Sequence, residues 1–336
     1  MMQFKKIPTT QYLGSKQKLI DWIIGRLPKF DSAFDAFSGS AVVSYHLKRM
    51  NKRIISNDFL KSSYLYAKAL IENNNITLSV EDIKNLFKEN KNKNDYIEMH
   101  FSDVFYTKEE CCFLDNLYAN INQLDDEYKQ AIVFAAMIRT CIQKMPGGKF
   151  RNNILKYRDK NFKHFRPKYA RDISITFRKF LIGYNNAVFN NGKQNKSYNE
   201  DVFNILPNMN VDLAYFDPPY GGSGFNYEKD YFFAELITKY YGKINKFNGK
   251  TKIYDIIREG GFNKKIDLEK NFDRLFNAAQ HIPIWIISYN NRSIPKLGHF
   301  TELIKKYKNI KSIHERPYRY RIGNSEGLKE MLFICQ

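Results

Sequence analysis

An apolar run from Val211 to Phe216, which ends in Asp217-Pro218-Pro219-Tyr220, constrains the fold of this chain more than any other feature. Such a run is typical of a strand that is buried on both faces. Two consecutive prolines then prevent the chain from continuing as sheet or helix. We therefore expect a carboxylate, a rigid backbone carbonyl and an aromatic ring at the carboxyl edge of a parallel sheet, where open α/β sheets bind their ligands.

Other apolar patterns predict an α/β fold around this strand. Residues 33–37 and 53–57 have the pattern of strands, and residues 40–50 that of a helix between them. A strand, a helix and a strand in this order favour parallel pairing. Further strands are predicted at residues 284–289 and 330–334.

A mainly helical stretch divides the sheet pattern. Thr107 to Glu110 forms a capping box, and residues 131–141 are apolar nearly all round, which indicates a buried helix that Pro146 ends. We therefore expect one discontinuous α/β domain, residues 1–60 and 196–336, and a helical insertion over residues 61–195.

The charge balance indicates a polyanionic partner. The chain has 54 Lys and Arg against 35 Asp and Glu, a formal net charge of +19. A lysine-rich proteome with solvated faces is the alternative explanation. Residues 151–180 gather ten basic and two acidic side chains, interleaved with aromatic rings that suit nucleic-acid bases or a local core. The candidate nucleic-acid contacts are Arg151, Arg158, Lys163, Arg166 and Lys168.

Several patterns that the sequence lacks limit where the protein can be located and which chemistry it can perform. No apolar stretch approaches the length of a membrane-spanning helix, and the first residues lack a signal-peptide pattern. The four cysteines and six histidines show no metal-ligand spacing, and adjacent Cys111 and Cys112 suit a reducing compartment. We expect a cytoplasmic protein without a metal site.

Three short motifs precede the proline-ended strand. Asp35-Ala-Phe37-Ser38-Gly39-Ser40 joins a predicted strand to a helix, where a turn of small residues lets a ligand approach the backbone. Asp58 follows the next strand, where nucleotide sites hold ribose hydroxyls, although a helix cap explains it equally well. Tyr12-Leu-Gly14-Ser-Lys16 suits a carboxylate ligand, or simply the start of a helix with a solvated lysine.

In this order, TxYxGSK, DxFxGS, SND and DPPY resemble the Dam-like (α-group) adenine-specific DNA methyltransferases. The resemblance covers residues 9–60 and about 196–336. It implies a Rossmann-like sheet that binds S-adenosylmethionine, a helical inserted target-recognition region, and site-specific methylation of the N6 amine of a flipped adenine in duplex DNA. One departure is that Ser40 and Ala41 follow Gly39, where the family often has a further glycine.

The resemblance also assigns roles to matched positions. Asp58 would hold the ribose hydroxyls, and Lys16 would face the methionine carboxylate. Asp201 would contact the cofactor adenine, with Val202 or Phe203 covering its ring; a turn cap is the alternative role for Asp201. The other residues of the implied cofactor pocket are Tyr12, Gly14, Asp35, Phe37, Ser38 and Gly39.

The chemistry of the DPPY segment suits an aromatic amine, whose lone pair is delocalised into its ring. The Asp217 carboxylate and the Pro218 carbonyl can accept both amine hydrogens and so turn the lone pair toward a methyl donor. Pro218 and Pro219 fix the direction of that carbonyl, and Tyr220 offers a face for stacking. Whether Asp217 only orients the amine or also takes its proton is open at this level.

Two alternatives compete with a DNA adenine methyltransferase. The same mechanism could act on RNA adenine, a cytosine amine or a protein amide. The chain could also be an inactive DNA-binding relative, although the intact Asp217 argues against this. We expect double-stranded DNA as partner, a separately acting cognate restriction endonuclease if the chain serves a restriction–modification system, and no membrane.

Overall fold

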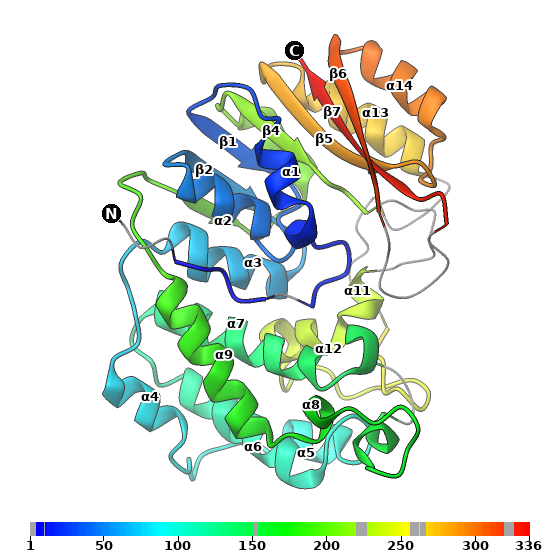
Figure 1. Ribbon diagram of the computed structural model, residues 1–336. Helices are drawn as coiled ribbons and strands as arrows, with labels where there is room; N and C mark the ends of the chain where they lie inside the picture. Colours follow the sequence, from blue (N-terminus) through cyan, green and yellow to red (C-terminus); the bar gives the residue numbers. More distant parts are fainter. Residues whose placement is uncertain are drawn as a thin grey trace. The chain divides into compact units, whose positions relative to one another are not determined.

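The computed structural model describes residues 5–9, 11–150, 154–219, 227–255, 262, 267–318 and 326–336. The chain forms two compact units (Figure 1). The sheet unit comprises Lys16–Phe59, Asn191–Tyr227 and Arg258–Gln336. The helical unit comprises Met1–Ser15, Leu60–Asn190 and Glu228–Ile257.

The sheet unit contains a seven-stranded sheet with the order β3-β2-β1-β4-β5-β7-β6 (Figure 1). The first five strands in this order run parallel, whereas β7 is antiparallel to both of its neighbours. The predicted α/β fold is therefore confirmed. The bounds are β1 Ser32–Asp35, β2 Arg53–Asn57, β3 Lys196–Tyr198, β4 Leu213–Phe216, β5 Ile284–Asn290, β6 Ile310–Pro317 and β7 Lys329–Cys335.

The two faces of the central strands differ in character. Side chains such as Phe34, Phe216, Trp285 and Phe333 enter an apolar core with α13 (Leu268–Ala279) and α14 (Leu297–Lys305). Because side chains alternate along a strand, the neighbouring positions point to the other face. That face carries α2 (Val42–Arg49) and the polar residues Asp35, Ser288 and Glu330. The remaining helices of the sheet unit are η1 Lys16–Lys18, α1 Ile20–Ile24, α10 Val202–Ile205 and η5 Leu206–Asn208.

The helical unit is built from short and medium helices (Figure 1). The predicted capping box begins α6, with Thr107 and Glu110 bonded to each other's backbone N–H groups, and the predicted buried helix is α7. The bounds are α3 Lys61–Ala67, η2 Lys68–Glu72, α4 Val80–Leu86, α5 Tyr96–Phe101, α6 Lys108–Ile121, α7 Glu127–Gln143, η3 Pro146–Gly148, η4 Leu155–Arg158, α8 Pro167–Ala170, α9 Ile173–Ala187, α11 Tyr227–Asp230 (at the unit boundary), α12 Phe232–Glu235 and η6 Leu236–Tyr240.

The units differ from the predicted domain boundaries at two segments. Residues 1–15 and 228–257 group with the helical unit. Contacts between these segments explain the grouping, because the Tyr12 ring stacks on Tyr231 with centroids 4.7 Å apart and the Leu13 N–H donates to the Tyr231 hydroxyl at 2.6 Å. Target recognition by the insertion stays a prediction.

Asp212 ties the starts of β1 and β4 together. Its Oδ2 atom accepts hydrogen bonds from the backbone N–H groups of Asp31 and Ser32, both at 2.8 Å, and from the Ser32 hydroxyl at 3.0 Å. The Asp31 N–H contributes most to holding the pKa of Asp212 below its usual value.

We expect Asp212→Ala to lower the free energy of unfolding by about 1–2 kcal/mol, because two backbone donors lose their acceptor. Urea denaturation at neutral pH measures this change. Asp31→Ala is the matched control, since the Asp31 side chain is 100% exposed and its removal should alter stability by less than about 0.5 kcal/mol. Equal losses of stability from the two substitutions would contradict the role of Asp212 in joining β1 to β4.

Candidate active site

The predicted site residues of the sheet unit gather where the strand order reverses. β1 pairs with β2 on one side and with β4 on the other. In open α/β sheets, ligands bind outside the carboxyl ends of the strands at such a reversal. Asp35 ends β1, Asp58 follows β2 and Asp217 follows β4. The parallel register therefore brings three acidic residues to one edge of the sheet.

The turn after β1 is closed by contacts from β2. The Gly39 N–H donates to Asp58 Oδ2 at 2.7 Å, and the Ser38 N–H donates to the Asn57 carbonyl at 2.9 Å. Gly39 and Ala41 both have left-handed backbone angles, with φ of 50° and 58°. Ala41 thus occupies a conformation that favours glycine, at a cost of about 1 kcal/mol. This is the place where the sequence departs from the family pattern.

Asp35 is a buried carboxyl with one oxygen satisfied. The Ser44 hydroxyl donates to its Oδ2 atom at 2.6 Å. Among the residues that the structure describes, neither Asp35 Oδ1 nor Ser38 Oγ has a hydrogen-bond partner. Burial raises the pKa of Asp35 from 3.8 to about 7; the Ser44 hydrogen bond lowers it, and the charges of Asp217 and Asp58 raise it. A cationic or hydrogen-bond donating ligand would satisfy both of these atoms.

Asp217 belongs to a buried ionic group. Lys16 Nζ lies 3.0 Å from Asp217 Oδ1 and 3.0 Å from Glu330 Oε1. The exposed fractions of the three side chains are 6% for Lys16, 15% for Asp217 and 2% for Glu330. Pro218, the next residue after Asp217, is buried and Pro219 is half-buried. The predicted contact of Lys16 with a ligand carboxylate stays a prediction, since the contacts described here join it to two protein carboxylates.

An apolar wall lies beside the β1 turn. The Phe37 ring meets Phe262 edge to face with centroids 5.4 Å apart, and Phe203 stacks on Phe262 at 6.1 Å. Val202 is buried in the same core. Asp201 caps α10, because its Oδ1 accepts the Phe203 N–H at 3.0 Å. The capping role, which the sequence left open for Asp201, is thus present.

Two of the predicted cofactor residues belong to the helical unit, and two further predicted site residues fall outside the described residues. Tyr12 and Gly14 belong to the helical unit, where the Tyr12 hydroxyl is 3.2 Å from Ser63 Oγ and Gly14 has φ of 75°. Tyr220 and Arg151 fall outside the described residues. Their predicted roles therefore stay predictions.

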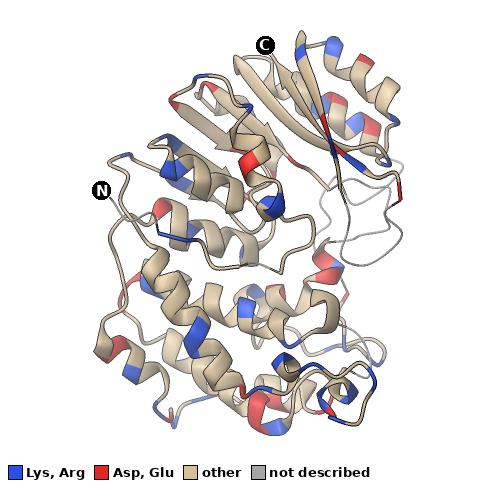
Figure 2. Cartoon of the chain, viewed as in Figure 1, with Lys and Arg blue, Asp and Glu red and all other residues tan. Residues whose placement is uncertain are grey.

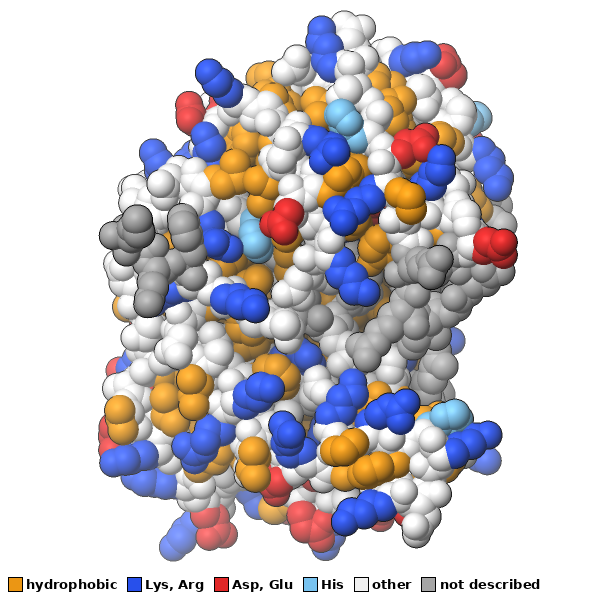
Figure 3. Space-filling model, in the orientation of Figure 1, with side chains coloured by type: hydrophobic (Ala, Val, Ile, Leu, Met, Phe, Trp, Pro, Cys, Tyr) orange, Lys and Arg blue, Asp and Glu red, His pale blue; other side chains and the backbone are white. Residues whose placement is uncertain are grey.

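The basic segment of the helical unit combines a local aromatic core with exposed cations. The Tyr157 ring meets Phe162 and Tyr169 edge to face, at 4.9 and 6.4 Å between centroids. Lys163 and Arg166 are exposed. Lys and Arg side chains occur along this segment and over the face drawn in space-filling form (Figures 2 and 3).

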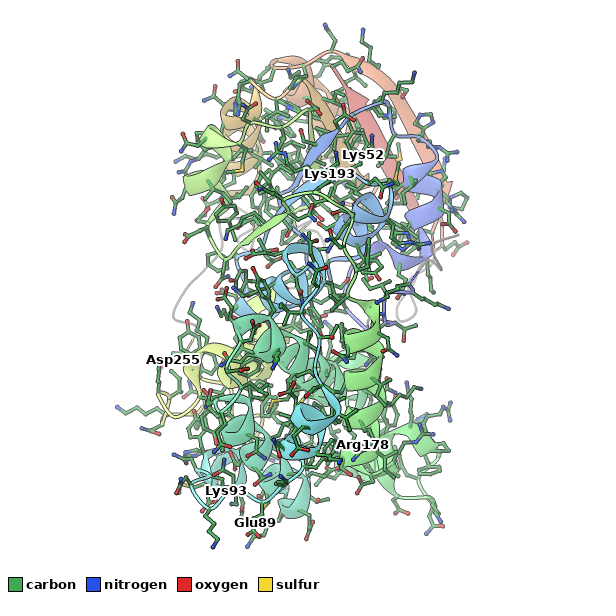
Figure 4. The ribbon with its side chains drawn as sticks, turned by 90° about the vertical axis from the view of Figure 1, so that its left-hand side faces the viewer. Lys52, Glu89, Lys93, Arg178, Lys193 and Asp255 are labelled. Atoms are coloured by element: carbon green, nitrogen blue, oxygen red, sulfur yellow. The ribbon has the colours of Figure 1, made fainter. Side chains whose placement is uncertain are left out.

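Other cations of the segment have partners within the protein. Arg158, 11% exposed, forms an ion pair with Glu110 and donates to the Phe105 carbonyl at 2.7 Å. Lys168 Nζ lies 4.9 Å from the centre of the Tyr169 ring. Arg178 lies on α9, with its guanidinium 4.1 Å from the centre of the Phe87 ring (Figure 4). These contacts give Arg158 in particular a structural role.

Sequence reasoning missed Phe262 and Glu330. Phe262 lies in a stretch without a strong strand or helix pattern, so the sequence held no signal for it. Glu330 begins the apolar run of β7, and an acidic residue in such a run is an available signal of a paired, buried carboxylate.

Within the described part of the chain, no group of three or more His, Cys, Asp or Glu side chains could hold a metal ion. No helix among those residues is long and apolar enough to cross a membrane.

Comparisons with known proteins agree with this arrangement. A family model described as D12 class N6 adenine-specific DNA methyltransferase matches residues 12–253. The type II methyltransferase M2.HphI of Haemophilus parahaemolyticus is 34% identical over 100% of this chain and 99% of its own length. The modification methylase StsI of Streptococcus sanguinis is 25% identical and M.FokI of Planomicrobium okeanokoites 27% identical; the matches cover 97% and 96% of this chain but 52% and 51% of those proteins.

The raised pKa of Asp35 gives a prediction about stability. A carboxyl whose pKa is higher in the folded than in the unfolded state favours folding at acid pH, and this contribution is lost as the pH rises through the folded-state pKa of about 7. Between about pH 5 and about pH 8.5, the wild type should lose about 2–3 kcal/mol of stability relative to Asp35→Asn. Urea denaturation of both proteins at the two pH values measures this, and a pH-independent difference would contradict it.

Proposed function

The chain belongs to the D12 class of N6 adenine-specific DNA methyltransferases, and from this premise we propose how its residues perform the transfer. It is an enzyme that methylates the N6 amine of adenine in DNA with S-adenosylmethionine as methyl donor. The adenine substrate implied by the sequence resemblance is thereby confirmed. The roles of individual residues are our proposal.

The observation that carries the proposal is the Asp217 carboxylate at the carboxyl end of β4, beside the reversal of strand order. Asp217 and the carbonyl of Pro218 accept the two hydrogens of the adenine amine, which rotates the nitrogen lone pair out of conjugation. The negative charge of Asp217 then stabilises the positive charge that develops on the nitrogen. Pro219 restricts the backbone, and Tyr220 stacks on the flipped base.

The residues around the β1 turn fit S-adenosylmethionine, which supplies a methyl group on a positively charged sulfur whose C–S bond breaks as the C–N bond forms. Asp35 Oδ1 and Ser38 Oγ, both buried and without a described partner, suit the ammonium group of its methionine part. Phe37, Val202 and Phe203 suit the flat adenine ring. Gly39 lets the ligand approach the backbone, and Asp58 holds the ribose hydroxyls.

Four other residues of the predicted cofactor site keep proposed roles. Tyr12 and Gly14 are proposed to border the cofactor from the TxYxGSK segment. Asp201 is proposed to reach the cofactor adenine with the carboxylate that also caps α10. Lys16 is proposed to act through Asp217, since its ammonium lies 3.0 Å from that carboxylate.

We propose that the helical unit recognises the DNA target and that its exposed cations contact phosphates. Lys163 and Arg166 are the best candidates because both are exposed. Lys168 and Arg151 are weaker ones, and Arg158 serves the fold through Glu110. Phosphate contacts position a protein on DNA without reading sequence, so base contacts come from other side chains.

The biological role of the chain is proposed from the names of the relatives. Type II methyltransferases and modification methylases are among them. We therefore propose that this chain protects specific sites within a restriction–modification system, beside a separately acting cognate endonuclease. We also propose a cytoplasmic location, which the DNA substrate and the four free cysteines support.

Asp217→Ala should lower the single-turnover rate of methyl transfer by about a hundredfold or more, because both orientation and charge at the amine are lost. Transfer of labelled methyl to unmethylated duplex DNA measures the rate, and digestion of the product locates the label on adenine N6. Asp217→Asn is the matched variant, since it keeps one acceptor and removes the charge. Full activity of Asp217→Ala would rule out the mechanism.

Changing Lys163 and Arg166 together to alanine should weaken DNA binding by roughly tenfold and reduce the slope of log affinity against log salt by about two. Lys305→Ala with Lys306→Ala, two exposed cations at the end of α14 and directly after it, is the matched control. Fluorescence anisotropy over a salt series measures both slopes. An unchanged salt slope would refute the assignment of Lys163 and Arg166 as phosphate contacts. A loss of S-adenosylmethionine affinity as large as the loss of DNA affinity would also refute it.

A further inference from the structure

Glu330 is a buried carboxylate that the proposed mechanism does not use. It is 2% exposed in β7, on the face opposite Met331 and Phe333, which belong to the apolar core. The Ser288 hydroxyl of β5 donates to its Oε1 atom at 3.0 Å. A buried charge without compensation is strongly unfavourable, so the presence of Glu330 in the sheet requires a partner.

Lys16 is that partner, and it links Glu330 to Asp217. Its Nζ atom lies 3.0 Å from one oxygen of each carboxylate. With all three groups ionised, two carboxylates share one ammonium, and the group carries one net negative charge. The pKa of Glu330 is raised: burial raises it most, Lys16 lowers it, the charge of Asp217 raises it, and the Ser288 hydrogen bond lowers it. Burial also raises the pKa of Tyr318; Lys16 lowers it, and the charges of Glu330 and Asp217 raise it.

We propose that Glu330 is a positioning residue for methyl transfer, which offsets the charge of Lys16 and fixes its ammonium against Asp217 Oδ1. Positive charge develops on the adenine nitrogen during the reaction. Lys16 beside Asp217 alone would cancel the carboxylate and oppose that charge. Glu330 restores a net negative charge next to the amine. The inference rests on the proposed role of Asp217.

Glu330→Gln tests it, because the amide keeps the shape of the side chain and removes its charge. In the full-length chain, the single-turnover rate at saturating S-adenosylmethionine and duplex DNA should fall roughly ten- to a hundredfold. The dissociation constants of S-adenosylmethionine and of DNA should change by less than about threefold, because Glu330 is proposed to act through Lys16 and not on either ligand directly. The control Glu315→Gln, an exposed carboxylate on β6, should leave the rate unchanged. An unchanged rate in folded Glu330→Gln, or a loss explained by weaker binding, would overturn the inference.

A double-mutant cycle tests whether Glu330 acts through Lys16. The rate loss from Glu330→Gln should be much smaller in a Lys16→Met background, and an equal loss in both backgrounds would overturn the inference. If Glu330→Gln does not fold, Ser288→Ala removes one hydrogen bond from the carboxylate. It should then slow the transfer by about two- to tenfold, and an unchanged rate would overturn the inference. Inactive Asp217→Ala beside fully active Glu330→Gln would refute this inference alone, whereas active Asp217→Ala would refute both proposals.

Discussion

The pairing of β1 with β4 is the constraint on which the site depends. β1 and β4 are parallel neighbours, and the strand order reverses between them. Asp212 joins their amino ends, and the Ala36 N–H donates to the Tyr215 carbonyl at 3.1 Å near their carboxyl ends. The same ladder therefore fixes Asp35 and Asp217, and a slip of β4 by one residue against β1 would send Asp217 to the apolar face.

Negative charge gathers on the polar face of these strands. Asp35, Asp217 and Glu330 come from three different strands or strand ends, and Lys16 forms ion pairs with Asp217 and Glu330. Burial and the charges of Asp217 and Asp58 explain the raised pKa of Asp35. A surplus of carboxylates opposes folding at neutral pH, but it suits cationic ligands and a transition state in which positive charge appears. The carboxylates of the site thus lower the stability of the fold but favour binding and reaction of positively charged groups.

The sequence predicted the features that depend on local pattern. Apolar runs located β1, β2, β4, β5 and β7, and the rule for parallel strands placed Asp35, Asp58 and Asp217 at one edge. Partners across long separations could not be predicted. Lys16 and Glu330 lie near opposite ends of the chain, and no local pattern encodes their contact.

Composition also could not separate structural from exposed cations. Arg158 and Lys163 look alike in the basic segment, yet only the fold brings Glu110 to Arg158. Charge counts therefore identify a segment suited to phosphate and not its individual contacts. The sequence also could not predict that residues 1–15 group with the helical unit. This grouping depends on the contact between the Tyr12 and Tyr231 rings, which lie far apart in the sequence.

The chain departs from the sheet unit after β2, at Phe59, and again after β4, at Tyr227. A crossover between parallel strands needs a dozen or more residues in any case, and lengthening a loop adds little entropic cost. Segments inserted there can vary without disturbing the β1–β4 ladder. By contrast, the residues proposed for the chemistry lie at or directly after the ends of strands, where the pairing register of the sheet fixes their positions. Under the proposed role of the helical unit in target recognition, a new DNA target would require changes in that unit, while Asp35 and Asp217 keep their places.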